Sequence, residues 1–476
     1  MTTANPAPLN GDRTSPRVRP FPRVARGGEL APLYPGHPIL GAGVLFRTRP
    51  IEALFKITDA CGDVARLRFP TKPRVAHLLR HPDYVRHVLV ENAKNYGKQT
   101  RGYAKLRGML GSGLVTSEGD FWKRQRRIAN PAFHRERIAH FSELMVNCAS
   151  EMLDGWKESV ASGKPFDVSR EMMRLTLRVI GLTMLSTDVQ AQSSAVGDAI
   201  DDLLHITIRR INSVLGWPEW VPTEQNRRYD RARSALDGIV NGMIAERRRS
   251  AKDRGDLLSM LMSARDPETG EGMSDTQLRD EAMTVFVAGH ETTANALTWT
   301  LCLLSRHPDA ERTLRREIRE VCGDRLPKLE DLDRLVYTEK VIKESMRLVP
   351  PVWIIARSAI EDDVIGGYRI PKDTWIFVSP YLMHHEPRFW ENPEGFDPGR
   401  FSPEEEAKRP KGAYFPFALG PRKCIGESFA MMEARLILAS IVQRTRLELV
   451  PGRSIELDPT VTLRPKGGLW MTARPA

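Results

Sequence analysis

The chain has 476 residues, enough for one large domain or several smaller ones. Its mixed composition is that of a globular protein, and no run approaches the roughly 20 apolar residues that a membrane-spanning helix needs. The formal net charge of +11 suggests a nucleic-acid partner, but lysine and arginine are spread along the chain without a motif that reads DNA or RNA. We therefore expect a cytoplasmic protein with no membrane span and no nucleic-acid partner.

The N-terminal part is expected to begin as a tail and to continue into a small sheet. Residues 1–25 are rich in Pro, Arg and Thr and lack an apolar segment, so we expect disorder rather than a signal peptide or anchor. After an extended entry at Pro32–Pro38, alternation in Val64–Phe69 and Val75–Leu79 predicts two paired strands. No repeat or linker divides the rest, which predicts a single domain over residues 26–476.

Helical periodicity dominates the centre of the sequence. It predicts four helices before the middle of the chain, at Arg135–Val160, Val168–Leu185, Ser193–Ile211 and Gln225–Lys252. Strands return toward the C-terminus, at Val364–Val378 and as a hairpin within Leu457–Thr472. The predicted fold class is mainly α with small peripheral β-sheets (α+β).

One of the five cysteines lies in a distinctive segment. The five lack a CxxC spacing, which argues against a disulfide framework and against structural zinc. The segment around Cys424 fits the pattern FxxGxRxCxG, whose fixed positions are Phe417, Gly420, Arg422, Cys424 and Gly426. A predicted helix, Glu427–Arg444, follows, and a helix N-terminus favours a thiolate. For a lone cysteine, the alternative is a buried inert thiol.

This segment resembles the haem-binding signature of the cytochrome P450 family, and the resemblance covers nearly the whole chain from about residue 30. It implies haem b (iron protoporphyrin IX) as the cofactor, with Cys424 as the axial ligand of the iron. Thiolate ligation favours O–O cleavage, which is the chemistry of a monooxygenase. It also implies the cytochrome P450 fold, in which a long central helix lies over the haem.

An unusually long helix is predicted from Asp275 to about Arg306. A capping box formed by Ser274 and Gln277 starts it, and the His-Pro pair that follows ends it. Its apolar centre is broken by a polar segment that begins with a His-Glu pair at His290. A zinc motif would need a second histidine at the position of Ala294, so we reject that reading.

The polar segment instead resembles the oxygen-binding pattern of the same family. By this resemblance, Ala288 and Gly289 lie beside the cofactor and leave room for dioxygen. The hydroxyl of Thr292 can bond back to the carbonyl of Ala288. Glu291 would supply protons through water, so Glu291 and Thr292 are the catalytic candidates. The alternative is a polar helix face that lines a crevice.

Two further groups of side chains are assigned by the resemblance. Arginine matches the geometry of the two haem propionates, and the residues assigned to them are Trp122, Arg126, Arg357 and Arg422. Taken singly, each is also explained as an exposed cation or a core aromatic. Glu344 and Arg347, three positions apart on a predicted helix, should form a structural ion network with Arg400. Gly399 stands where the family usually has an acid, which puts the outer part of that network in doubt.

Substrate and partner are assigned from the remaining positions. The predicted pocket residues are mostly apolar, and they are Phe286, Val352, Trp353, Ile354, Val461 and Thr462. We therefore expect a lipophilic substrate, such as a terpenoid, a fatty acid or a steroid-like molecule, together with dioxygen.

The electron donor is expected to be a separate protein. A basic patch favours an acidic ferredoxin or flavodoxin that passes on electrons from NAD(P)H, and its members are Lys123, Arg124, Arg127 and Lys423. The alternatives are a peroxygenase or isomerase on the same scaffold and a non-catalytic haem-thiolate sensor.

Overall fold

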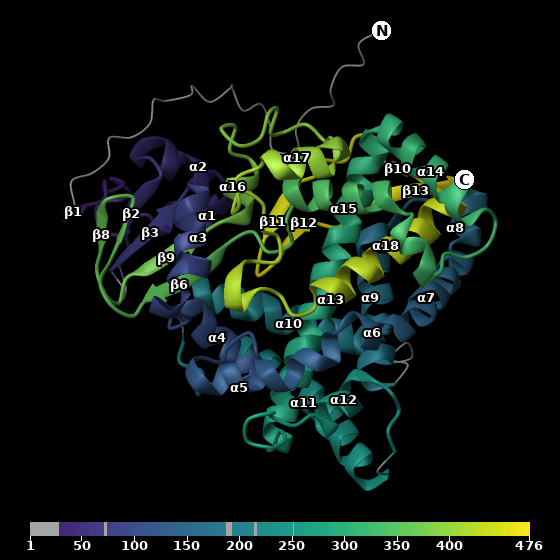
Figure 1. Cartoon of the computed structure of the whole chain (residues 1–476), viewed down its shortest axis with the longest axis horizontal. Coiled ribbons are helices and arrows are strands. Elements are labelled where there is room, and N and C mark those ends of the chain that lie inside the picture. The colour runs from purple at the N-terminus through teal and green to yellow at the C-terminus, as the bar shows by residue number, and fades with distance from the viewer. Residues whose placement is uncertain (1–27, 71–73, 187–192, 214–216, 251) are drawn as a thin grey trace.

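The computed structural model describes residues 28–70, 74–186, 193–213, 217–250 and 252–476. The expected tail, residues 1–25, lies outside this part of the chain. Helices fill most of the molecule, and the largest sheet lies to one side (Figure 1). No helix of the described ranges combines the length and the apolar composition needed to cross a bilayer.

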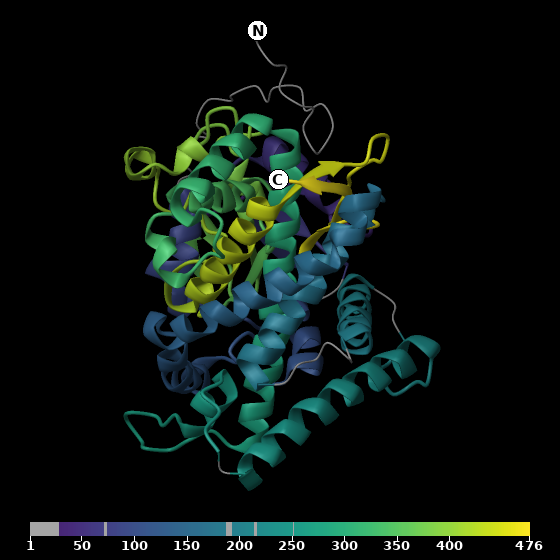
Figure 2. The same ribbon diagram turned by 90° about the vertical axis from the view of Figure 1, so that its right-hand side faces the viewer.

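The helices belong to one large body (Figures 1 and 2). They are α1 (Gly43–Thr48), α2 (Pro50–Cys61), α3 (Pro82–Arg86), α4 (Arg101–Leu110), α5 (Gly119–Ala129), α6 (Arg135–Ile138), α7 (Ser142–Gly155), α8 (Lys157–Ser162), α9 (Val168–Leu185), α10 (Ser193–Asn212), α11 (Glu224–Ser250), α12 (Leu257–Ser263), α13 (Asp275–Arg306), α14 (Pro308–Cys322), α15 (Val336–Leu348), α16 (Pro380–His384), α17 (Pro403–Lys408) and α18 (Glu427–Arg444). The mainly α prediction is confirmed.

Within the described ranges, the strands form four small sheets. They are β1 (Glu29–Leu30), β2 (Val64–Arg68), β3 (Val75–Leu79), β4 (Tyr96–Gly97), β5 (Phe166–Asp167), β6 (Ile355–Ala359), β7 (Asp363–Ile365), β8 (Tyr368–Ile370), β9 (Trp375–Val378), β10 (Thr445–Leu449), β11 (Leu457–Pro459), β12 (Leu463–Pro465) and β13 (Trp470–Pro475). The largest sheet has the order β2-β3-β9-β6-β4, and the others are β1-β8-β7, β10-β13-β5 and β11-β12. The predicted pairing of β2 with β3 is confirmed as antiparallel.

Helix α13 runs through the middle of the molecule, and α18 crosses it (Figures 1 and 2). Its start is fixed by the predicted capping box, in which Ser274 accepts from the Gln277 N–H at 3.2 Å and donates its own N–H to the Gln277 side chain at 2.7 Å. Most of its 32 residues are buried, so tertiary packing adds to the local signals.

Two sequence predictions differ from the structure. The single helix predicted over Arg135–Val160 is broken into α6, α7 and α8: the 3-10 turn Ala139–Phe141 separates α6 from α7, and the chain turns at Trp156 between α7 and α8. That side chain is 3 % exposed and donates its Nε1–H to Glu171 at 3.0 Å, which fixes the turn. The predicted hairpin within Leu457–Thr472 is shorter than expected. Only β11 and β12 pair with each other, whereas β13 pairs with β10 and β5.

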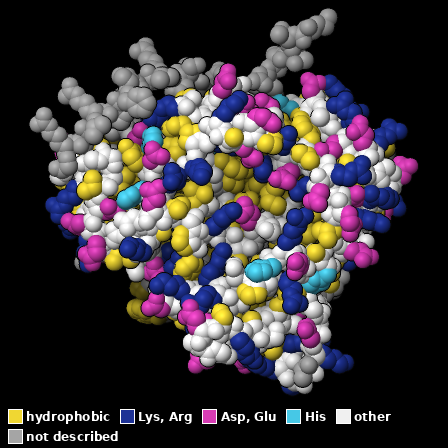
Figure 3. All heavy atoms as spheres, viewed as in Figure 1, with side chains coloured by type: hydrophobic (Ala, Val, Ile, Leu, Met, Phe, Trp, Pro, Cys, Tyr) yellow, Lys and Arg dark blue, Asp and Glu magenta, His cyan; other side chains and the backbone are white. Residues whose placement is uncertain are grey.

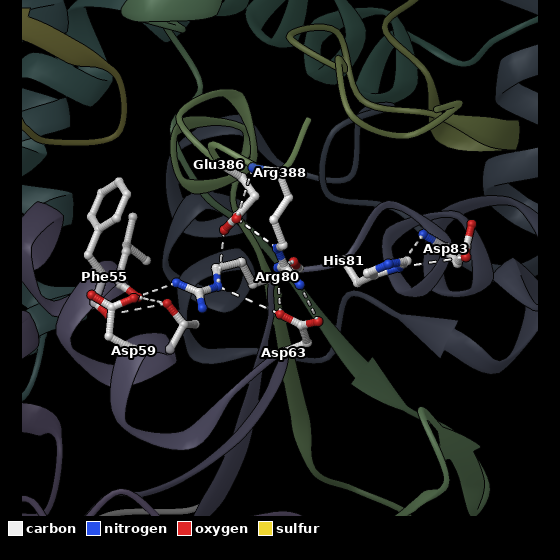
Figure 4. A network of polar contacts seen from close by, with 10 residues as sticks. Phe55, Asp59, Asp63, Arg80, His81, Asp83, Glu386 and Arg388 are labelled. Atoms are coloured by element: carbon white, nitrogen blue, oxygen red, sulfur yellow. Dashed lines mark hydrogen bonds and ion pairs between the residues drawn. The ribbon is translucent and has the colours of Figure 1, made fainter. Parts of the chain in front are cut away.

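A buried ionic network anchors the largest sheet to the segment that follows α16 (Figure 4). Arg388 binds both oxygens of Asp63 at 2.8 and 2.7 Å and binds Glu386 at 2.7 Å. Arg80 lies 3.2 Å from Glu386, so each carboxylate has two guanidinium partners. Because buried carboxylates are stable only when paired, we infer that this network fixes the position of the sheet.

Candidate active site

The loop that carries Cys424 is held by backbone contacts. The Cys424 N–H donates to the Phe417 carbonyl at 2.9 Å, which closes the loop just before α18. Gly420 has φ +70°, and a Cβ there would lie 2.9 Å from the carbonyl carbon of Leu89 and closer still to its oxygen. Only glycine fits this approach. The loop is thereby docked on the short helix η1 (His87–Glu91).

The Cys424 thiol is accessible to solvent, although dense protein lies around it. Burial is the largest effect and raises the pKa of this thiol, whereas the Gly426 N–H, Arg126 and Lys423 lower it. We had expected the helix N-terminus to favour the thiolate. Helix α18 begins only at Glu427, whose own charge raises the pKa, so the helix does not outweigh burial. The nearby N–H and cations nevertheless stabilise a sulfur anion once a metal cation has displaced the proton.

The polar segment of α13 contains accessible positions, although this helix runs through the middle of the molecule (Figures 1 and 2). The Thr292 hydroxyl donates to the Ala288 carbonyl at 2.6 Å, as the sequence predicts. Ala288 is exposed and Thr292 is half-buried, whereas most of α13 is buried. A Cβ on Gly289 would lie 3.0 Å from the Ile180 side chain of α9. The glycine therefore also serves helix packing, which the sequence did not indicate.

The side chains of Glu291 and Thr292 point in different directions, although the two residues are adjacent in the sequence. Neighbouring helix positions diverge by about 100°, and the structure directs the Glu291 carboxylate to the hairpin β11–β12. There the Thr462 hydroxyl donates to it at 2.6 Å, and Arg464 forms an ion pair at 3.4 Å. Burial is the largest effect and raises the pKa of Glu291, while Arg464 and Thr462 oppose this rise. The two catalytic candidates therefore face different surroundings.

Four cations of the described residues lie close to one another, and the resemblance implies three of them. The four are Lys98, Arg126, Arg357 and Arg422. The Arg422 guanidinium stacks 3.7 Å above the Trp122 ring and donates to the Ser117 carbonyl at 2.8 Å. Arg357 donates to the Tyr103 hydroxyl at 3.2 Å. Arg126 interacts electrostatically with Cys424, which links the cationic cluster to the sulfur.

Lys98 is the cation of this cluster that was not predicted from the sequence. Its ammonium group is buried and donates to the Val115 carbonyl at 2.6 Å. Burial, followed by repulsion from Arg357 and Arg422, holds the pKa of Lys98 well below its usual range. A buried lysine has no local sequence signal, because burial depends on how the distant strand β6 folds over it.

The cationic cluster has the chemistry of a site for an acidic group. Within the described residues, none of the four cations forms an ion pair with a carboxylate, and nearby Glu118 accepts the backbone N–H of Lys98 instead. Buried cations of like charge are costly without an anion. Two propionates would neutralise them, while Cys424 would bind the iron. The residues therefore fit a haem.

The predicted ion network is present and buried. Arg347 binds both oxygens of Glu344 at 2.6 and 2.7 Å, and both side chains are 0 % exposed. Arg400 lies 3.3 Å from Glu344, and the Asp397 N–H donates to the same carboxylate at 2.9 Å. The three predicted members of the network are thus joined, although Gly399 stands where the family usually has an acid.

The predicted pocket residues divide into two groups. Phe286 and Trp353 are buried, and Val352, Ile354 and Val461 are partly buried. The Trp353 indole donates to the Thr460 carbonyl at 3.0 Å, so it anchors the hairpin tip. Thr462 is engaged with Glu291, a contact that sequence reasoning did not anticipate.

The cations of the predicted basic patch are already paired with acids. Lys123 lies 2.8 Å from Asp120, and Lys423 is paired with Glu427. Arg124 and Arg127 reach acids in the loop before α13. The pairs of Lys123 and Lys423 are local, whereas those of Arg124 and Arg127 join distant parts of the chain and could not be predicted from the sequence. The patch is therefore less positive than expected, and steering of an acidic partner would be weaker.

Comparisons with known proteins agree with this geometry. A family model described as cytochrome P450 matches residues 32–471. Cyclooctatin synthase from Streptomyces melanosporofaciens is 38 % identical over 92 % of this chain and 94 % of its own length. Cyclooctat-9-en-7-ol 5-monooxygenase from the same organism is 38 % identical over 88 % of this chain and 89 % of its own. A crystal structure of the cytochrome P450DA heme domain matches with a TM-score of 0.87 at 28 % identity, covering 94 % of this chain and 98 % of the other.

Proposed function

The chain belongs to the cytochrome P450 family of monooxygenases, and from that premise we propose that it inserts one atom of dioxygen into a lipophilic small molecule. One observation carries this proposal. Cys424 is accessible and interacts electrostatically with Arg126, a member of a cationic cluster without carboxylate ion pairs among the described residues, and Thr292 donates to Ala288 at a polar, accessible part of α13. These are the groups needed to hold a haem and to activate oxygen beside it.

Each residue has a defined task in this scheme. Cys424 binds the iron, and Lys98, Arg126, Arg357 and Arg422 bind the two propionates. The bound haem supplies a metal centre at which dioxygen is cleaved. The Thr292 hydroxyl, which donates a hydrogen bond to the Ala288 carbonyl in this structure, would donate to the oxygen species that the haem holds. Breaking dioxygen consumes protons, so a hydroxyl in the accessible space is the required type of group.

Glu291 is the source from which those protons are replaced. Burial raises the pKa of its carboxyl, which favours a protonated form that can donate. Its present contacts point to the hairpin rather than to Thr292, so its side chain or an intervening water chain must bridge the two.

The substrate is proposed to be a terpenoid, a fatty acid or a steroid-like molecule. The pocket residues around Phe286 and Ile354 are apolar, and such linings bind lipophilic ligands. The relative named for cyclooctat-9-en-7-ol supports this class. Hydrophobic side chains also gather around a recess near the middle of the face in Figure 3, in the area that β11 and β12 occupy in Figure 1.

Electrons are proposed to come from NAD(P)H through a separate ferredoxin or flavodoxin. The partner would meet the surface around Lys123 and Lys423, of which Lys423 precedes Cys424 in the sequence and acts electrostatically on its thiol. Because these cations are paired, we expect binding to depend only modestly on salt concentration.

The test is turnover by the holoenzyme with a surrogate ferredoxin and ferredoxin reductase. Terpenoid alcohols, fatty acids and steroids are first screened for a spin-state shift of the haem, and compounds that bind are then incubated with NADPH. Hydroxylated product that requires both NADPH and dioxygen supports the proposal. Product formed with hydrogen peroxide alone would favour a peroxygenase, and binding without any product would favour a sensor.

A further inference from the structure

The hairpin β11–β12 carries Arg464 into contact with two carboxylates from different helices. Its Nη2 lies 3.4 Å from Glu291 Oε1 on α13, and its Nη1 lies 3.3 Å from Asp201 Oδ1 on α10. The Glu291 side chain is 3 % exposed, whereas that of Asp201 is 54 % exposed. One guanidinium therefore links a buried carboxylate to a surface carboxylate.

A second hairpin residue binds the same Glu291 oxygen. The Thr462 hydroxyl donates to Glu291 Oε1 at 2.6 Å and accepts from the Asn295 side-chain amide at 3.0 Å. Both neighbours are buried. Because Thr462 already accepts the amide hydrogen, its own proton points to Glu291. The hairpin thus supplies a neutral donor and a cation to one oxygen atom.

The two contacts differ in kind. The contact from Thr462 is a hydrogen bond, whereas Arg464 Nη2 is buried and makes an ion pair without any hydrogen bond among the described residues. A buried N–H without a hydrogen-bond acceptor is costly. The ion pair is therefore the weaker and more adjustable of the two contacts, and small shifts of Arg464 change it most.

We propose that Arg464 is a positioning residue for Glu291. Because Arg464 also forms an ion pair with Asp201, the contact between the hairpin and α10 determines how strongly Arg464 holds Glu291. The proposal rests on the proposed role of Glu291 as the proton source. When Asp201 is engaged, it shares the positive charge of Arg464 and weakens its hold on Glu291. When α10 moves away, the whole charge of Arg464 acts on Glu291.

The charges around Glu291 set the direction of this effect. Among the described residues, the charged groups that act on it most are Arg464 from β12, Asp201 from α10 and Asp458 from β11. Arg464 lowers the pKa of Glu291, and the two aspartates raise it, in addition to the rise caused by burial. His205 of α10 lies in the same field, with its own pKa lowered by burial. Contact between α10 and the hairpin therefore favours the protonated, donating form of Glu291.

Infrared titration of the substrate-free ferric holoenzyme tests the proposal. The carboxyl band of Glu291 is identified by its loss in Glu291→Gln, and its midpoint is measured in variants. Arg464→Gln should raise the midpoint by about one to three pH units, the usual effect of a close opposite charge. Arg464→Lys should restore most of the original midpoint.

Two further variants make the outcome decisive. Asp201→Asn should lower the midpoint, opposite in sign to Arg464→Gln and smaller, because Asp201 is half exposed to solvent. Lys466→Gln is the matched control, since this hairpin cation pairs with Glu456 at 2.9 Å and does not touch Glu291. An unchanged midpoint in Arg464→Gln, or shifts of the same sign in both variants, would overturn the proposal.

Oxygen consumption separates this proposal from the one on which it rests. The assay uses surrogate ferredoxin and reductase, NADPH and dodecanoic acid as the lipophilic probe. Glu291→Gln should slow consumption several-fold, and Arg464→Gln should move the pH of half-maximal rate upward with the infrared midpoint. If Glu291→Gln had no effect, the proton-source role would fail even where the infrared shifts appear. If Glu291→Gln slowed the reaction but Arg464→Gln left the pH profile unmoved, only the positioning role would fail.

Discussion

Replacement of Gly420 by alanine tests the docking of the cysteine loop on η1. The residue has φ +70°, and a left-handed conformation costs a non-glycine residue about 1–2 kcal/mol. A Cβ would also press on the backbone carbonyl of Leu89, which cannot rotate away as a side chain can. Displacing a packed neighbour costs about 1–3 kcal/mol more. The expected loss of unfolding free energy is therefore roughly 2–5 kcal/mol.

Gly452 provides the matched control for this substitution. It has φ +76°, and a Cβ there would meet no atom within 4 Å. Gly452→Ala should therefore lose only the conformational part, about 1–2 kcal/mol. The measurement is urea unfolding of both holoprotein variants, followed by tryptophan fluorescence and haem absorbance. Equal losses in the two variants would refute the inference that the Leu89 carbonyl restricts position 420.

Three further predictions follow from the buried polar groups. Arg347→Met removes two guanidinium hydrogen bonds from the fully buried Glu344 and leaves Arg400 as its ion-pair partner, so it should lower the unfolding free energy by about 3–5 kcal/mol in urea titrations, whereas the exposed Arg174→Met should change it little. Thr292→Ala should keep the haem bound but release more hydrogen peroxide per NADPH, measured with surrogate partners; unchanged coupling would contradict the role of this hydroxyl. Burial raises the pKa of Glu281 from 4.5 to about 7. The folded protein therefore holds this proton more tightly than the unfolded chain does, and the contribution of Glu281 to the unfolding free energy is full below pH 4.5 and falls as the pH rises to 7. Glu281→Gln should remove this fall, worth at most roughly 3 kcal/mol, and parallel urea midpoints of the two proteins from pH 5 to 8 would contradict it.

Elements with local signals were predicted well. Helices α9, α13 and α18 have the predicted bounds, because apolar periodicity and capping residues lie within the elements themselves. The back-bond of Thr292 to Ala288 spans four positions and was predicted for the same reason. The break at Trp156 was missed because the need to bury that indole against Glu171 is set by tertiary packing.

Contacts between distant positions were beyond local reasoning. The link from Thr462 to Glu291 spans 171 positions, and that from Arg388 to Asp63 spans 325. Resemblance to the family supplied Arg126, Arg357 and Arg422, but it did not supply Lys98, whose burial follows from the fold. A backbone N–H that lowers the pKa of Cys424 was predicted and is present at Gly426, but the burial that raises this pKa was not predicted. The burial of a side chain depends on tertiary packing and is therefore hard to predict from the sequence.

The central claim is that Cys424 binds haem iron as a thiolate, and carbon monoxide difference spectroscopy tests it most directly. The reduced carbonyl complex of the wild-type holoprotein should show the red-shifted Soret band of a thiolate-ligated haem. Cys424→Ser should lose that band, while Cys61→Ser, a change at a half-buried cysteine away from the loop, should keep it. A red-shifted band that survives in Cys424→Ser would contradict the account.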